Sequence, residues 1–214
     1  MLGLMRVGGC VGGHSNFGFA MITDINQLDF SKRYSYADYL TWKFQERVEL
    51  FKGWLARMGA PSTAHQRISG RLSFQLAQYF QQSTCELFVA PFDVRLPDSQ
   101  KGTADEVVYN VVQPDLCVIC DPAKIDARGC IGAPDWVIEI LSPGNNKHEI
   151  QNKFRLYEEA GVKEYWIVFP AEQVVHVFDL KEDGCYQLRM MYSNEDAVPS
   201  GLFPELAVDM REVF

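Results

Sequence analysis

Hydrophobic and polar positions predict two buried strands near the middle of the chain. The runs are VVYNVVQPDLCVICDP, residues 107–122, and APDWVIEILSPG, residues 133–144. Their content of Val, Ile, Leu, Cys and Trp is typical of buried strands. Each run carries a carboxylate where a strand interior disfavours one, Asp115 in the first and Glu139 in the second. Because a buried carboxylate is destabilising unless a cation or a metal ion neutralises it, the two runs predict a charged site inside the fold.

A helical pattern follows the second run and supplies a cation. Residues 146–160, NKHEIQNKFRLYEEA, are expected to form a helix that Gly161 ends, with Lys153 near its middle. Strand, strand and helix are therefore expected to converge on a metal site with Lys153 as an assisting cation. Asp135 shares the strand face of Glu139, but four residues of strand span about 13 Å, so it is expected to be a strand-entry residue.

The remaining patterns predict further helices and strands on both sides of this region. A short amphipathic helix is expected over residues 34–44 with Ser35 as its N-cap, and a longer one from Ser62 or Thr63 to about Gln82. Residues 47–58 read as a hairpin with a Lys52-Gly53 turn. Residues 88–96 read as one strand, residues 165–169, 174–180 and 186–192 as an antiparallel meander, and the tail as a short strand with a turn capped by Asp209.

Length and charge narrow the class of protein. The chain has 214 residues and a net charge of −8. Residues 21–214 are expected to form one domain, because a chain of this length buries a single substantial core. The acidic balance gives no long-range attraction to nucleic acid, so any such contact requires a local basic patch. No apolar run approaches the roughly 20 residues that a membrane span requires.

Residues 1–20 are expected to be a non-native or disordered extension. They are glycine-rich, and glycines and polar residues interrupt the apolar stretch that a signal peptide needs. Met21 is an alternative start of the chain. We therefore leave residues 1–20 out of the fold argument.

The cysteines are expected to be reduced thiols, which makes the cytoplasm the default location. Cys117 and Cys120 are three residues apart in a predicted strand, where their side chains point to opposite faces. No second cysteine pair or nearby histidine completes a zinc site around them. A chain of this length also needs no disulfide staples.

An ordered set of short motifs carries a family resemblance. The motifs occupy residues 49–53, 65–68, 93–96, 114–116 and 137–143, Lys153 with Tyr157, and residues 160–162 and 164–166. No single motif is specific, but their order over residues 34–214 resembles the Uma2 family of restriction-endonuclease-like proteins. The resemblance implies an α/β fold similar to that of the PD-(D/E)xK nucleases, with a mixed central β-sheet flanked by helices. It also implies acids on adjacent strands that hold a divalent metal ion, Mg²⁺ or Mn²⁺.

The resemblance assigns roles to individual residues. Asp115 matches the Asp of the superfamily motif, Glu139 matches its (D/E), and Glu49 matches an additional N-terminal Glu. The sequence departs from the superfamily pattern at Leu141, where a lysine is expected two residues after the Glu. Lys153 then substitutes for it from the following helix, as the Uma2 pattern itself shows.

Phosphodiester hydrolysis is chemistry that such residues can support. It needs an activated water and charge compensation at the phosphoryl group, and a hard cation held by one or two carboxylates supplies both. Opposed residues of neighbouring strands lie about 5 Å apart, so Asp115 and Glu139 are able to share an ion. Lys153 is then expected to steady the transition-state charge.

Each assignment has a structural alternative. Glu139 and Lys153 also fit a buried structural ion pair, and Lys153 fits a surface pair with Glu149 four residues earlier. Glu49 fits a solvated residue beside a turn, and His65 fits a hydrogen-bonding residue at a helix start better than a metal ligand. Four cations are candidates for a phosphate-facing groove, although scattered cations are usually just solvated. They are Arg47, Lys52, Arg57 and Arg67.

The sequence thus predicts a Mg²⁺-dependent nuclease with catalytic Asp115, Glu139, Lys153 and Glu49, of which the three acids hold the metal. The expected partners are nucleic acid, DNA rather than RNA, and a second copy of the chain in a homodimer. The rival interpretation is a catalytically silent binding or scaffold module that keeps the nuclease fold. A metal-dependent hydrolase of another phosphoester is a third.

Overall fold

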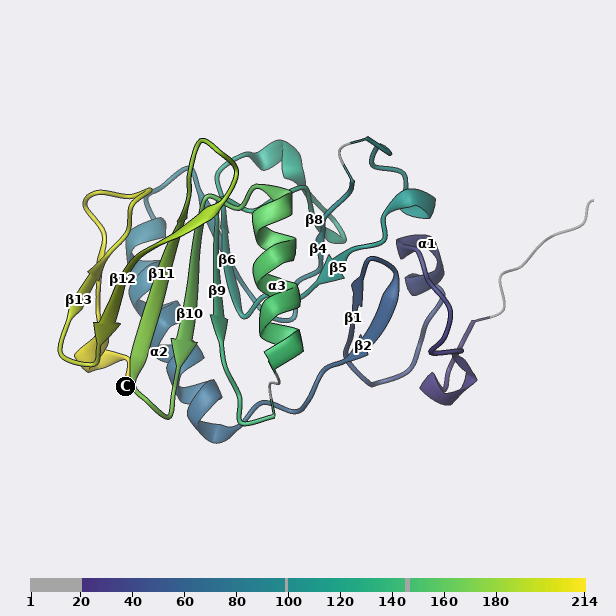
Figure 1. The fold of residues 1–214 in the computed structure, drawn as a ribbon, viewed down its shortest axis with the longest axis horizontal. Helices are drawn as coiled ribbons and strands as arrows, with labels where there is room; N and C mark the ends of the chain where they lie inside the picture. The colour runs from purple at the N-terminus through teal and green to yellow at the C-terminus, as the bar shows by residue number, and fades with distance from the viewer. Residues whose placement is uncertain (1–20, 99, 145–146) are drawn as a thin grey trace, which may run out of the picture.

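The computed structural model describes residues 21–98, 100–144 and 147–214, and within them the chain forms two mixed β-sheets and a separate strand pair (Figure 1). The extension expected over residues 1–20 and the helix start expected at residue 146 lie outside the described residues. No helix in the described ranges has the length and apolarity to span a membrane.

The first sheet, here the N-terminal sheet, has the strand order β2-β1-β5-β4-β8-β7. Its strands are β1 (Val48–Phe51), β2 (Trp54–Arg57), β4 (Val94–Arg95), β5 (Val111–Val112), β7 (Ile125–Asp126) and β8 (Gly129–Ile131). The expected hairpin is confirmed as β1 and β2, and Lys52 and Gly53 of its turn both have positive φ, 51° and 87°. That conformation matches the twist of the two strands.

The second sheet, here the central sheet, has the order β12-β11-β10-β9-β6-β3. Its strands are β3 (Glu86–Val89), β6 (Leu116–Ile119), β9 (Trp136–Ile140), β10 (Glu164–Phe169), β11 (Val174–Leu180) and β12 (Tyr186–Ser193). Strands β9 and β10 are parallel, whereas β10, β11 and β12 form the expected antiparallel meander. The predicted mixed sheet flanked by helices is therefore confirmed.

The helices are short α1 (Tyr36–Tyr39), α2 (Thr63–Phe80) and α3 (Lys147–Ala160). Ser62 caps α2 through the backbone N–H of His65, as predicted, and Gly161 follows α3 with a φ of 88°. Four single turns and one hairpin complete the described chain. They are η1 (Ile25–Gln27), η2 (Asp105–Val107), η3 (Pro122–Lys124), η4 (Met210–Glu212), and β13 (Ala197–Pro199) with β14 (Ala207–Asp209).

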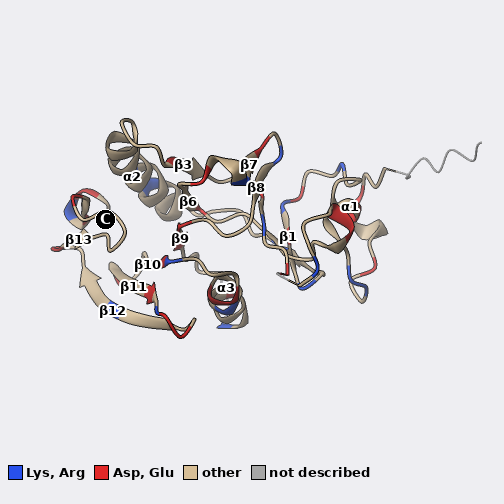
Figure 2. Cartoon of the chain, turned by 90° about the horizontal axis from the view of Figure 1, so that it is seen from above, with Lys and Arg blue, Asp and Glu red and all other residues tan. Residues whose placement is uncertain are grey.

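Helices α2 and α3 cover opposite faces of the central sheet, as Figure 2 shows from above. On β9, Trp136, Ile138 and Ile140 belong to the hydrophobic cluster of α2, and Val137 belongs to that of α3. Because side chains alternate along a strand, Glu139 lies on the face that α3 covers. The sheet therefore fixes which helix can meet this acid.

Two predicted elements are wrong in extent. Residues 34–44 give only the four-residue α1, which follows the predicted N-cap Ser35 and whose Asp38 completes a capping box. Residues 88–96 are not one strand: β3 ends at Val89 in the central sheet, and β4 begins at Val94 in the N-terminal sheet. Pro91 lies between them, and a proline cannot donate a ladder hydrogen bond.

The expectation that all cysteines are reduced is also wrong, because Cys85 and Cys120 form a disulfide. Strands β3 and β6 are antiparallel with Glu86 opposite Ile119, so the next opposed pair in this register is Cys85 with Cys120, whose Cα atoms lie 3.9 Å apart. The expected opposite orientation of Cys117 is confirmed, since it is buried on the α3 side while Cys120 packs on the α2 side.

Candidate active site

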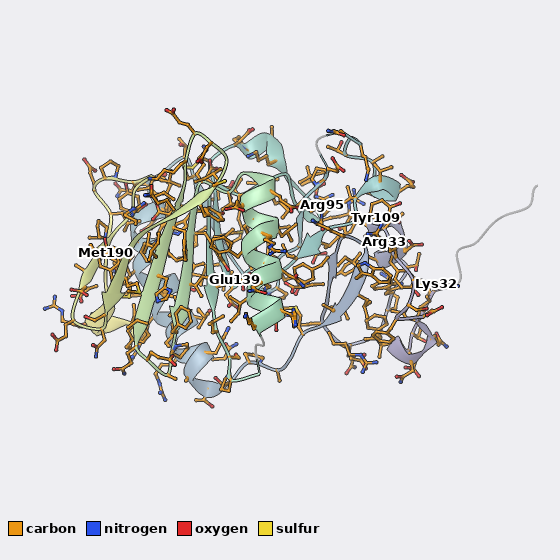
Figure 3. All side chains as sticks on the ribbon, viewed as in Figure 1. Lys32, Arg33, Arg95, Tyr109, Glu139 and Met190 are labelled. Atoms are coloured by element: carbon orange, nitrogen blue, oxygen red, sulfur yellow. A yellow bond between two sulfur atoms is a disulfide. The ribbon has the colours of Figure 1, made fainter. Side chains whose placement is uncertain are left out.

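Glu139, which Figure 3 labels, lies beside α3. Together with Lys153 it forms the centre of a buried polar cluster between β9 and α3. The Nζ of Lys153 donates to both carboxylate oxygens of Glu139, each at 2.9 Å. The hydroxyl of Tyr157, one helical turn further along α3, donates to Oε1 of Glu139 at 2.6 Å. Lys153 is thus a buried partner of Glu139, as the ion-pair alternative and the catalytic assignment both require.

Glu49 joins the cluster from the N-terminal sheet. It lies inside β1 with only 2% of its surface exposed, so the alternative of a solvated residue is excluded. Its Oε1 lies 3.2 Å from the Nζ of Lys153 and accepts a hydrogen bond of 2.9 Å from the backbone N–H of Gln113. Two sheets therefore supply acids to one lysine.

Asp115 directly precedes β6 rather than lying inside it, which corrects the predicted strand interior. Leu116 pairs with Ile138 in the antiparallel ladder of β6 and β9, so one further step places Asp115 opposite Glu139. Opposed residues of this kind have Cβ atoms about 5 Å apart. The Oδ2 of Asp115 accepts from the backbone N–H of Ile140 at 2.7 Å, which holds the carboxylate beside β9.

His65 holds the other oxygen of Asp115. Its Nε2 lies 3.1 Å from Oδ1 of Asp115, and its side chain is 10% exposed. Within the described chain, the Nδ1 of His65 is buried without a hydrogen-bond partner. The helix-start position of His65 is confirmed, and the structure adds a contact with an acid of the site that the sequence did not indicate.

The electrostatics of the cluster reflect an excess of acid. Burial raises the pKa of Glu139 to about 7; Lys153 opposes this rise, and Asp115 and Glu49 add to it. For Lys153, burial lowers the pKa, but Glu139 and Glu49 outweigh it and leave the value raised. Three carboxylates thus meet one ammonium group, and a divalent cation is the kind of ligand that would offset the remaining charge.

A pocket of about 380 Å³ opens onto these residues. Its wall includes Asp115, Glu139, Lys153 and His65. Of the four cations considered for a phosphate-facing groove, Arg47 and Arg57 line it as well. Lys52 instead pairs with Glu159 at 3.0 Å, and Arg67 lies on an exposed part of α2.

Several contributions to the site were not predicted from the sequence. The side chain of Tyr157 is buried, and its hydroxyl binds Glu139, a contact that no sequence pattern indicated. Gln113, whose backbone N–H binds Glu49, belongs to no motif. Its position two residues before Asp115 was the only hint in the sequence that it lies near the site. Asp135 is confirmed as a strand-entry residue, because it binds Lys163 at 2.6 Å and the backbone of Cys120.

The donors present fit a hard divalent cation, although they do not form a complete cage. No cluster of three or more Asp, Glu, His or Cys side chains arranged for a metal ion occurs among the described residues. Mg²⁺, however, is commonly bound through one or two carboxylates together with waters and substrate phosphates. Asp115 and Glu139, opposed across β6 and β9 and lining one pocket, provide that number of oxygen ligands.

Comparisons with known proteins identify the family and the fold of the chain. Residues 36–211 match the family model of Uma2, described as "Putative restriction endonuclease". A curated relative, the uncharacterized protein slr1290 of Synechocystis sp., is 28% identical over 150 residues, which cover 69% of this chain and 74% of the relative.

The fold has a solved counterpart. It is similar to the crystal structure of a "putative nuclease belonging to DUF820" from Anabaena variabilis, with a TM-score of 0.65 at 20% identity, over 85% of this chain and 97% of that one. The family match spans both sheets and every acid of the site. This chain therefore belongs to the Uma2 family.

Proposed function

We propose that the protein is a metal-dependent nuclease that hydrolyses phosphodiester bonds at the cluster of Asp115, Glu139, Glu49 and Lys153. The observation that carries the proposal is the placement of Asp115 opposite Glu139, in one pocket with a buried lysine. The family's description as a restriction endonuclease supports the same class of reaction. DNA is the proposed substrate, as expected from the sequence.

Asp115 and Glu139 would hold the divalent ion, Mg²⁺ or Mn²⁺, with Glu49 as the third acid of the site. The ion would supply a water activated for attack and charge compensation at the phosphoryl group. His65 orients Asp115, and Tyr157 orients Glu139 through its hydroxyl. Lys153 has three ammonium donors, and exchanging one of its acidic contacts for a phosphoryl oxygen would place its charge on the substrate.

A catalytically silent binding module remains the second candidate, and one observation favours it. Lys153 already satisfies both oxygens of Glu139, so the pair is able to serve as a structural ion pair without any metal. The net charge of −8 adds weaker support, because it gives no general attraction to nucleic acid.

Metal-dependent stabilisation tests the site itself. Mg²⁺ or Mn²⁺ should raise the melting temperature, because an ion that binds only the folded state stabilises it by about 2.7 kcal/mol at a hundredfold excess over its Kd. Asp115→Asn with Glu139→Gln should remove most of this rise. The matched control, Glu172→Gln with Glu205→Gln, deletes two exposed carboxylates and should keep it. An equal rise in both double variants would place the ion elsewhere.

Cleavage separates the nuclease from the silent module. Nicking of plasmid or single-stranded DNA should depend on the metal and be strongest at low ionic strength, because phosphate contacts weaken steeply with salt. Glu139→Ala should abolish it in a protein that stays folded. Absence of cleavage with Mg²⁺, Mn²⁺ and Co²⁺ would favour the binding module.

The homodimer and the cytoplasmic location stay predictions.

A further inference from the structure

Arg47 brings a fixed guanidinium group to the rim of the pocket. It directly precedes β1 and is half-buried among the lining residues. Its Nε and one terminal nitrogen both donate to Oε1 of Gln113, at 2.9 and 2.8 Å. Two hydrogen bonds to one oxygen hold the planar group in a single orientation and leave its remaining N–H donors for another acceptor.

Gln113 is held in place by contacts that fix which end of its amide meets Arg47. Its Nε2 donates to Oδ1 of Asp93 at 2.8 Å, so its oxygen faces the guanidinium. Its backbone N–H donates to Oε1 of Glu49. One buried residue therefore orients both an acid of the site and a cation of the pocket wall.

Arg47 differs from the other cations of the pocket in its partners. Lys153 contacts Glu139 and Glu49. The guanidinium of Arg57 stacks over the ring of Phe30, 4.8 Å from its centroid. Among the described residues no carboxylate lies within ion-pair distance of Arg47, whose hydrogen-bond partner is the neutral amide of Gln113. Asp93 interacts with its charge electrostatically from behind Gln113, and the N–H donors that Gln113 does not occupy are available to an anion that enters the pocket.

We infer that Arg47 binds the phosphate next to the one that is cleaved, and that Gln113 is its positioning residue. The inference rests on the proposed nuclease function. It adds that the substrate of the nuclease presents at least two adjacent phosphates to the pocket. Arg47 lines the same pocket as Asp115 and Glu139. Along the chain it lies two residues, roughly 7 Å, from Glu49, a backbone spacing of the order of the step between successive phosphates of one nucleic-acid strand. A substrate that uses both sites has adjacent phosphodiesters, so it is an oligonucleotide strand rather than a phosphomonoester or a mononucleotide.

Binding of a fluorescent single-stranded oligothymidylate to the Glu139→Gln protein, which cannot complete the metal site, tests the inference. Adding Arg47→Gln should weaken binding about tenfold, as expected for one charged hydrogen-bonded contact. It should also reduce the slope of log K against log salt by about 0.7, the value for one phosphate on a single strand. Arg47→Lys keeps the charge, so it should preserve the slope and recover part of the affinity.

Arg155→Gln is the matched control. Arg155 is exposed on α3 two residues after Lys153, which is about 200° around the helix, so this variant removes the same charge away from the pocket. It should leave the affinity and the slope nearly unchanged. In the active protein, Arg47→Gln should raise KM more than it lowers kcat, because the contact is made equally before and during reaction.

A modified probe locates the phosphate. Replacing the phosphate beside the cleaved one by an uncharged methylphosphonate should weaken binding to the Glu139→Gln parent protein and, to a smaller extent, to Arg47→Lys, but it should not further weaken binding to Arg47→Gln. Additive losses would overturn the assignment of Arg47, as would equal losses from Arg47→Gln and Arg155→Gln. If the parent binds no oligothymidylate at all, the proposed nuclease function fails, and the inference fails with it. Should Arg47→Gln not fold, the comparison of the parent with Arg47→Lys decides: the methylphosphonate should cost Arg47→Lys less affinity than it costs the parent, and equal losses would overturn the assignment.

Discussion

Lys153 of α3 donates to both carboxylate oxygens of Glu139 on β9, each at 2.9 Å. Both residues are buried, at 7% and 6% exposure. This contact serves the catalytic and the purely structural interpretation alike, so its two consequences, for stability and for activity, need to be measured separately.

Lys153→Met should lower the free energy of unfolding by about 3–5 kcal/mol, because it leaves Glu139 and Glu49 buried without their cation. Adding Glu139→Gln should restore part of this loss, since the amide carries no charge. Urea unfolding of the wild type, Lys153→Met and the Lys153→Met/Glu139→Gln double variant measures both effects. A Lys153→Met protein as stable as the wild type would show that the ion pair is open to water.

Leu141→Lys in the Lys153→Met protein should recover part of the nuclease activity. Leu141 lines the same pocket and lies two residues after Glu139, about 7 Å along the strand. Plasmid cleavage by folded protein is the measurement, with Leu141→Met as the control of similar size. If activity follows stability alone across these variants, Lys153 is structural and not catalytic.

Regular elements were predictable because their signals are local. The apolar spacing and the Ser62 cap of α2, and the alternation of β11, lie within a few residues of one another. Residues 88–96 were misread because the alternation continues across Pro91, where the chain leaves one sheet for the other. The disulfide depends on the register of β3 with β6, and no local pattern contains that register.

The residues of the site were likewise predictable where their signal is local, and not predictable where it depends on distant parts of the chain. Asp115 and Glu139 stand out as carboxylates in apolar runs, whereas the contact of Glu49 with Lys153 depends on a helix formed far later in the chain. The contact of His65 with Asp115 joins α2 to β6, and its sequence signal is indistinguishable from that of an ordinary helix-start residue. Gln113 is recognisable only once Arg47 and Glu49 are seen on either side of it.

Stability without divalent ions should decrease as the pH rises from about 4.5 to about 7. Burial, with Asp115 and Glu49 nearby, raises the pKa of Glu139 from 4.5 to about 7, against the effect of Lys153. In that range the folded chain keeps a proton that the unfolded chain has released, so the contribution is complete below the lower value and lost above the upper one. Glu139→Gln should lack this decrease, and saturating Mg²⁺ should diminish it.

Urea unfolding at each pH gives the free energy of unfolding of the wild type and of Glu139→Gln. The difference between the two removes the contribution of every titrating group that both proteins share. Parallel curves of unfolding free energy against pH would mean that folding leaves the pKa of Glu139 unchanged, because the charge of Lys153 fully offsets the effect of burial. The same series with Mg²⁺ then reports on the ion alone.

His65→Ala should weaken Mn²⁺ binding by about 10- to 100-fold, the usual cost of removing a hydrogen-bond partner of a metal-ligating carboxylate. The Nε2 of His65 lies 3.1 Å from Asp115, and without it Oδ1 loses its orientation. His65→Gln, which retains a donor, should lose less. Isothermal titration with Mn²⁺ measures the affinity, and Gln66→Ala on the exposed side of the same turn is the control.

Reduction of the Cys85–Cys120 disulfide should lower the free energy of unfolding by about 3–4 kcal/mol, the entropy estimate for a loop with the observed separation of 35 residues. Unfolding with and without dithiothreitol measures it. Cys85→Ala with Cys120→Ala should lose a similar amount and become insensitive to the reductant, whereas the exposed Cys185→Ala should behave as wild type. Insensitivity of the wild type would mean that the bond is absent in solution.

The supply of acids from both sheets also bears on synthesis of the chain. Glu49 is made early, whereas β9 and α3, which carry Glu139 and Lys153, leave the ribosome much later. Until α3 docks, a folded N-terminal sheet would bury the carboxylate of Glu49 without its ammonium partner, which disfavours early folding. A truncated or half-made chain therefore holds no assembled cluster of Glu49, Glu139 and Lys153, and any activity of this cluster would begin only after α3 has been synthesised.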